Sequence, residues 1–186
     1  MNLGKWAELN RYITKRKSIA NIAVSALISY YKGDFENNIN KLTSNQILII
    51  QAKNDSYKFF TLICLYKCAV MTKNEKLMEQ SRLELEKINF KNASKEKWRQ
   101  NTLNFCHMMQ EILVLEKSSE LIDSWRPQYP GGKINLLEKM YFQALNERLK
   151  NNEIKSKEYF QELSTNDAKI YFVKEAKKYL EEENGK

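Results

Sequence analysis

Apolar residues recur every three or four positions along nearly the whole chain, the spacing that places them on one face of an α-helix. One clear stretch consists of Ile19, Ala23, Ala26 and Tyr30. Short polar segments interrupt the pattern near residues 33, 73, 117 and 151. The pattern predicts an all-α protein of eight or nine helices, each of roughly 10 to 20 residues, paired as antiparallel hairpins.

Turn-forming residues are scarce and concentrated in one place. The chain has 186 residues with only five glycines and two prolines, and residues 126–132 hold both prolines and two of the glycines. This scarcity argues against an all-β fold and against glycine-rich phosphate loops. We therefore predict a single helical domain over 1–186, with a subdivision at 126–133 into 1–125 and 134–186 as the alternative.

Side chains that cap helices predict two of the helix starts. Ser94 follows a polar loop and can accept from the first free amides of a helix. Asn135, with Glu138 three residues later, has the spacing of a capping box. A shorter helical segment is expected around residues 121–125.

The segment from Tyr30 to Ile39, YYKGDFENNI, resembles the turn between the two helices of a tetratricopeptide repeat. Ala26 stands at the small position of the family's first helix, and Leu42 at the large position of its second helix. Asn38 departs from the family, which prefers alanine there.

A second match to tetratricopeptide repeats covers residues 136–163. Ala144 takes the small position, residues 151–153 the turn, and Ser156 and Phe160 the small and large positions of the second helix. The resemblance implies a short α-solenoid of stacked hairpins whose concave surface, lined by the first helices, binds a peptide or protein. Three residues on those helices are the expected contacts: Tyr30, Tyr141 and Arg148.

The positions that clamp chaperone tails in one subclass of the family hold no matching lysine or asparagine here. Chaperone tails are therefore not the expected partner. The sequence identifies neither the partner nor the oligomeric state.

Charge suggests an alternative function. Lysine and arginine total 31 against 23 aspartate and glutamate, so the formal net charge is +8. Only six of these cations are arginine, whose planar guanidinium binds phosphate through two parallel hydrogen bonds better than lysine does. We therefore interpret most of the positive charge as a result of lysine-rich composition. One local cluster is the candidate site for nucleic acid or an anionic membrane surface: Arg11, Lys15, Arg16 and Lys17.

Four residues deserve a test as metal ligands or catalysts. Cys64 and Cys68 share a helix face, and Cys106 and His107 lie together on another helix. Their apolar surroundings favour core cysteines over a zinc site. His107 is the only histidine and its neighbours suggest packing; an enzyme would need a perturbed acid beside it. We predict no enzymatic activity and no cofactor.

The expected location is cytoplasmic, or the cytoplasmic face of a membrane if an anchor precedes the chain. Three cysteines form no disulfide framework, which fits a reducing compartment. The longest uncharged run, residues 18–31, is shorter than the roughly 18 to 20 residues that span a bilayer.

Overall fold

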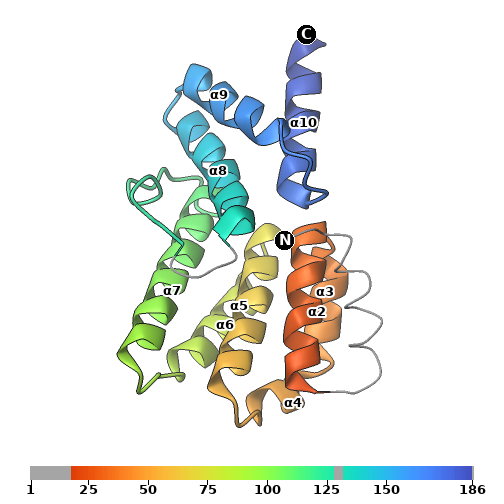
Figure 1. The fold of residues 1–186 in the computed structure, drawn as a ribbon, viewed down its shortest axis with the longest axis vertical. Helices are drawn as coiled ribbons and strands as arrows, with labels where there is room; N and C mark the ends of the chain where they lie inside the picture. Colours follow the sequence, from red (N-terminus) through yellow and green to blue (C-terminus); the bar gives the residue numbers. More distant parts are fainter. Residues whose placement is uncertain (1–17, 128–131, 186) are drawn as a thin grey trace. The chain divides into compact units, whose positions relative to one another are not determined.

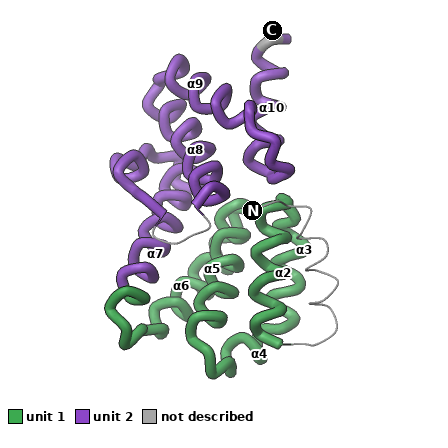
Figure 2. The backbone as a smooth tube through the Cα atoms, viewed as in Figure 1, with its two compact units in different colours: residues 1–96 green, residues 97–186 purple. Residues whose placement is uncertain are grey.

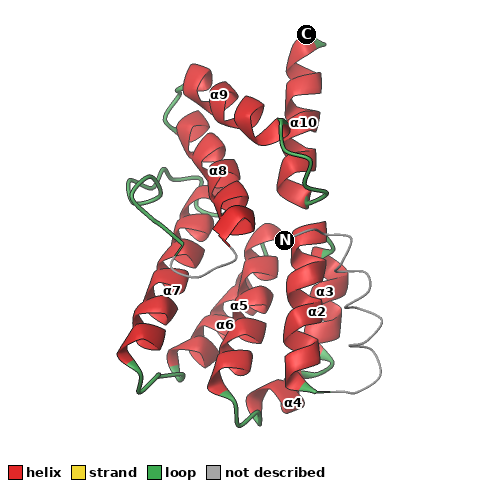
Figure 3. Ribbon diagram, viewed as in Figure 1, coloured by secondary structure: helices red, strands yellow, loops and turns green. Residues whose placement is uncertain are grey.

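The structure, a computed structural model, describes residues 18–127 and 132–185. Within these ranges it contains nine α-helices and no strand (Figures 1 and 3). The predicted all-α class and the predicted number of helices are therefore confirmed for this part of the chain. None of its helices combines the length and apolar character needed to cross a bilayer.

The chain forms two compact units, residues 1–96 and 97–186 (Figure 2). The boundary lies in the first turn of the helix α7 (Ala93–Leu113) rather than near residues 126–133. Whether the units fold as one domain or two stays a prediction. We call them unit 1 and unit 2.

Unit 1 is built around one central helix. Its elements are α2 (Ile19–Lys32), α3 (Phe35–Thr43), α4 (Gln46–Ile50), α5 (Asp55–Met71) and α6 (Glu75–Glu86). Helix α5 contacts the other four, and every one of its residues from Thr61 to Val70 is buried. Burial on all sides explains why α5 is apolar around most of its circumference.

Unit 2 combines most of α7 with α8 (Gly132–Leu149), α9 (Glu153–Ser164) and α10 (Tyr171–Asn184). Helices α8, α9 and α10 contact one another. Phenylalanine rings fill the core: Phe142 packs edge-on against Phe105 at 5.8 Å and is tilted against Phe172 at 6.1 Å between ring centroids. Burial of such large rings is a main source of stability for a small helical unit.

Three helix ends share one backbone geometry. In each, a residue with positive φ (85°, 53° and 59°) donates to the carbonyl three residues back at 2.9 to 3.1 Å. The next residue donates to the carbonyl five residues back at 2.8 to 3.0 Å. This is the Schellman motif, which satisfies the free carbonyls at a helix end. The positive-φ residues, which end α2, α5 and α8, are Gly33, Lys73 and Asn151.

Three local predictions are wrong in detail. Helix α7 begins at Ala93, and the side chain of Asn92, not Ser94, accepts from the Lys95 amide at 3.0 Å. Helix α8 begins at Gly132, so Asn135 lies inside the helix and does not cap it. Residues 120–124 form turns rather than a short helix. There Trp125 stacks on Phe105, with ring centroids 4.3 Å apart, and the aromatic stack holds the segment without helical structure.

Candidate functional site

Two of the predicted contact residues lie together in unit 2. Tyr141 and Arg148 are both on α8, and interactions with side chains of α10 involve each of them. Tyr171, Glu175 and Tyr179 recur every four residues on α10, which places them on one face of that helix. We call these five residues, Tyr141, Arg148, Tyr171, Glu175 and Tyr179, the α8–α10 strip.

Paired tyrosines form one end of the strip. The rings of Tyr141 and Tyr171 meet edge-on with centroids 6.2 Å apart. Burial raises the pKa of Tyr141 above its usual range, and the neighbouring Tyr171 and Glu175 raise it further. Burial also raises the pKa of Tyr171, and the negative charge of Glu175 raises it further. Like any tyrosine, both phenols are neutral at pH 7, and the raised pKa values extend the neutral form to higher pH.

An arginine stacked on an aromatic ring forms the other end. The guanidinium carbon of Arg148 lies 5.2 Å from the ring centroid of Tyr179, a cation–π arrangement. Tyr179 also packs on Phe160, with ring centroids 4.3 Å apart, and this contact holds the Tyr179 ring in place. The guanidinium is thereby oriented before any partner binds, which lowers the entropic cost of binding.

The strip is accessible where a partner would need it. Arg148 is exposed, and Tyr171, Glu175 and Tyr179 are half-buried. Among the described residues Arg148 forms no ion pair. Its five N–H groups can therefore donate hydrogen bonds to a carboxylate of a binding partner. Tyr141 is buried and serves as the floor of the strip.

Tyr30 lies elsewhere. It belongs to α2 in unit 1, where its side chain has no exposed surface. Its ring packs edge-on against Tyr31 at 5.2 Å and tilted against Phe35 at 5.7 Å, and the Lys67 ammonium lies 5.2 Å from its centroid. In this structure Tyr30 is therefore a core residue. The predicted anionic-surface cluster of Arg11, Lys15, Arg16 and Lys17 lies outside the described residues.

The cysteines and the histidine separate into two environments. Cys64, Cys68 and Cys106 are buried free thiols, whereas His107 is exposed, so the expectation that His107 packs in the core is wrong. Burial raises the pKa of the Cys68 thiol well above its usual range, and the neighbouring Cys64 raises it further. No group of three or more His, Cys, Asp and Glu side chains in the described ranges is arranged to hold a metal ion.

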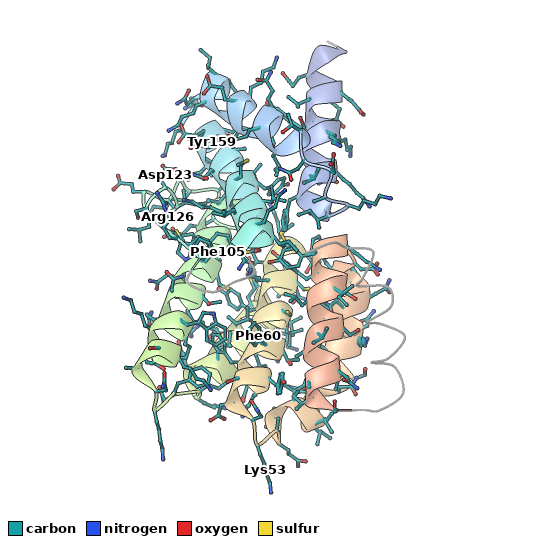
Figure 4. All side chains as sticks on the ribbon, viewed as in Figure 1. Lys53, Phe60, Phe105, Asp123, Arg126 and Tyr159 are labelled. Carbon is teal, nitrogen blue, oxygen red and sulfur yellow. The ribbon has the colours of Figure 1, made fainter. Side chains whose placement is uncertain are left out.

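A polar cluster that the sequence did not predict lies around Asp123. The Gln143 amide donates to the Asp123 carboxylate at 2.7 Å, and the buried Lys139 ammonium donates to the Asp123 backbone carbonyl at 3.0 Å. Burial lowers the pKa of Lys139, and nearby Arg126 lowers it further. Figure 4 shows Asp123, Arg126 and Tyr159 on the same side of unit 2. Because these groups bind one another, we interpret the cluster as structural.

The part that α10 plays in the strip was also not predicted from the sequence. The four-residue spacing of Tyr171, Glu175 and Tyr179 was the available signal. No protein-family model, curated protein or solved structure matches the chain.

Proposed function

We propose that this chain is a non-enzymatic adapter that binds a protein or peptide partner along the α8–α10 strip. The observation that carries the proposal is Arg148, exposed, stacked on Tyr179 and without an ion pair among the described residues. Arginine and tyrosine are the residue types enriched where binding energy is concentrated. A fitting partner segment has a carboxylate for Arg148 and an apolar or aromatic side chain for the tyrosines.

The order of helix contacts supports a tetratricopeptide-like arrangement. In unit 1, α2 contacts α3 and α5, α3 contacts α5, and α5 contacts α6. This is the order in which each hairpin of a solenoid packs on the first helix of the next. In unit 2, α8, α9 and α10 contact one another in the same way. On this proposal α8 and α10 are successive first helices, and the strip lies on the partner-binding face.

The experiment is selection of peptides from a random phage-displayed library against the full chain, followed by fluorescence polarisation with the enriched peptides. We expect Arg148→Ala to weaken binding at least about tenfold. Arg82→Ala is the matched control, since Arg82 is also an arginine on a helix surface but pairs with Glu79 and Glu86. Circular dichroism verifies that both variants fold.

Two results would contradict the proposal. One is that no peptide is enriched over a library panned on an unrelated helical protein. The other is that the Arg148 and Arg82 variants bind the enriched peptides equally well, which would place the binding surface away from the strip.

A further inference from the structure

The short helix α4 presents aliphatic side chains to solvent. Its sequence is QILII, and Ile47, Leu48 and Ile50 are 74%, 40% and 39% exposed. Only Ile49, 1% exposed, is buried, and α4 contacts α5. One buried isoleucine therefore anchors the helix while three aliphatic side chains remain outside the core of unit 1.

Such exposure has no structural benefit for unit 1. Leaving an aliphatic side chain in water forgoes about 1.5 to 3 kcal/mol relative to full burial. Adjacent exposed aliphatic residues of this kind are characteristic of interaction surfaces. Helix α4 is thus a candidate contact surface, separate from the α8–α10 strip.

Lysines flank α4 in the sequence and define the kind of partner that fits it. Between Glu36 and Glu75 the only acidic residue is Asp55. Lys41 and Lys53 are exposed, Lys58 is half-buried, and Figure 4 shows Lys53 extending from the chain just after α4. Unit 1 as a whole has 16 Lys and Arg against 9 Asp and Glu, whereas unit 2 has 15 against 14. The net positive charge is therefore concentrated in the unit that carries α4.

Helix α2 starts, α3 ends and α5 starts at the end of unit 1 where α4 lies (Figure 1). The described lysines that stand close to these helix ends in the sequence are Lys41, at the end of α3, and Lys53 and Lys58, just before and within the first turn of α5. The described part of unit 1 alone therefore supplies basic side chains for a partner of α4.

We propose that α4 binds an anionic phospholipid bilayer, with Ile47, Leu48 and Ile50 inserted at the boundary between headgroups and acyl chains. The lysines around α4 bind the lipid phosphates, since their long aliphatic stems let the ammonium groups stay at the level of the headgroups. A nucleic acid would use the lysines but leave the three aliphatic residues without a partner. Two copies of the chain that met through α4 would bring the lysines near each α4 together, and the repulsion between these like charges would oppose the contact.

The test is flotation of the full chain with vesicles of phosphatidylcholine alone or mixed with phosphatidylglycerol. We expect flotation only with the mixed vesicles and a marked loss as salt rises. The double variant I47S/I50S should partition at least about tenfold more weakly. The double variant I154S/L136S is the matched control, because Ile154 (78% exposed) and Leu136 (45% exposed) are solvent-exposed aliphatic residues of unit 2. It should float like the wild type.

A second measurement reports insertion directly. The variant Ile47→Cys, labelled with an environment-sensitive dye, should brighten with the mixed vesicles, whereas Ile154→Cys labelled in the same way should not. Labelling at these positions is selective because the three native cysteines are buried.

Four outcomes would overturn the proposal. Wild-type protein that does not float with the mixed vesicles, or equal flotation of I47S/I50S, rules out insertion of α4. Retention by an oligonucleotide without vesicle binding would identify nucleic acid as the partner. A dimer in sedimentation velocity that I47S/I50S dissociates would identify a second copy instead.

Discussion

The side chain of Asn146 forms hydrogen bonds with both backbone groups of Ser119, its amide and its carbonyl. Its oxygen accepts from the Ser119 amide at 2.7 Å, and its nitrogen donates to the Ser119 carbonyl at 3.1 Å. Both residues are buried, and the bond pair joins α8 to the segment that follows α7. A non-helical segment can be buried in this way because an amide side chain replaces the backbone partner that it lacks.

Asn146→Ala should therefore destabilise the protein by about 2 to 4 kcal/mol, because it leaves two buried backbone groups without partners. Urea denaturation followed by circular dichroism measures the change. Asn104→Ala, at an exposed position on α7, is the control and should change stability by less than about 0.5 kcal/mol. Equal effects of the two substitutions would show that the Ser119 bonds contribute nothing.

The left-handed residues of two Schellman turns should respond to substitution with stability changes of opposite sign. Gly33 has φ of 85°, where a Cβ atom is unfavourable, so Gly33→Ala should destabilise by about 1 kcal/mol. Lys73 has φ of 53°, so Lys73→Gly should stabilise by about 0.5 kcal/mol. Thermal denaturation of both variants measures the two signs. If Lys73→Gly destabilises by as much as Gly33→Ala, then the left-handed geometry does not control these turns.

The helical pattern and the turn positions were predictable because they depend on residues close in sequence. The buried faces of α2 and α8 follow the three- and four-residue spacing, and turns occur near residues 33, 73 and 151 as expected. The cap at Asn92 was missed because several polar residues in that loop can cap, and only the backbone conformation selects one of them.

Contacts between distant residues were not predictable from one sequence. Arg148 meets Tyr179 and Tyr141 meets Tyr171 only because α10 folds back onto α8. Burial of Tyr30 was missed for a related reason: a tyrosine at the edge of an apolar stripe is exposed or buried according to which helix packs on it.

Stability should fall at high pH, partly because of Tyr141. Its pKa is raised in the folded state, so above about pH 10 the unfolded chain loses this proton first and unfolding becomes more favourable. Urea midpoints at about pH 8 and about pH 10.5 measure the decline. Tyr141→Phe should lessen it, whereas Tyr57→Phe, at an exposed position, should leave it unchanged. A decline of wild-type size in Tyr141→Phe would contradict this assignment.

Asn38 contains a buried oxygen without a hydrogen-bond partner. Its side-chain nitrogen donates to the Ala26 carbonyl at 2.8 Å and to the Cys68 sulfur at 3.3 Å, but Oδ1 has none. Asn38→Asp should destabilise by more than about 3 kcal/mol, since it buries an unpaired carboxylate. Asn38→Ala should cost about 1 kcal/mol or less, because losing the orphaned oxygen offsets the lost bonds. Chemical denaturation compares them, and equal losses would exclude an orphaned oxygen.

The three cysteines should be unreactive in the folded protein. All are buried, and burial raises the pKa of Cys68, so little reactive thiolate is present. Ellman's reagent at pH 8 should react slowly with native protein and rapidly with all three thiols in guanidinium chloride. Mass spectrometry after brief N-ethylmaleimide treatment identifies any exception. Rapid native labelling of Cys68 would mean that α5 opens readily.

The Schellman turns after α2, α5 and α8 keep the same hydrogen bonds although their residue pairs are Gly-Asp, Lys-Asn and Asn-Asn. Backbone atoms alone form those bonds, so the turn can persist while nearly every side chain around it is replaced. Each of these chain reversals therefore places its demand on one backbone conformation and leaves the side chains of the turn free to carry other charges and functions.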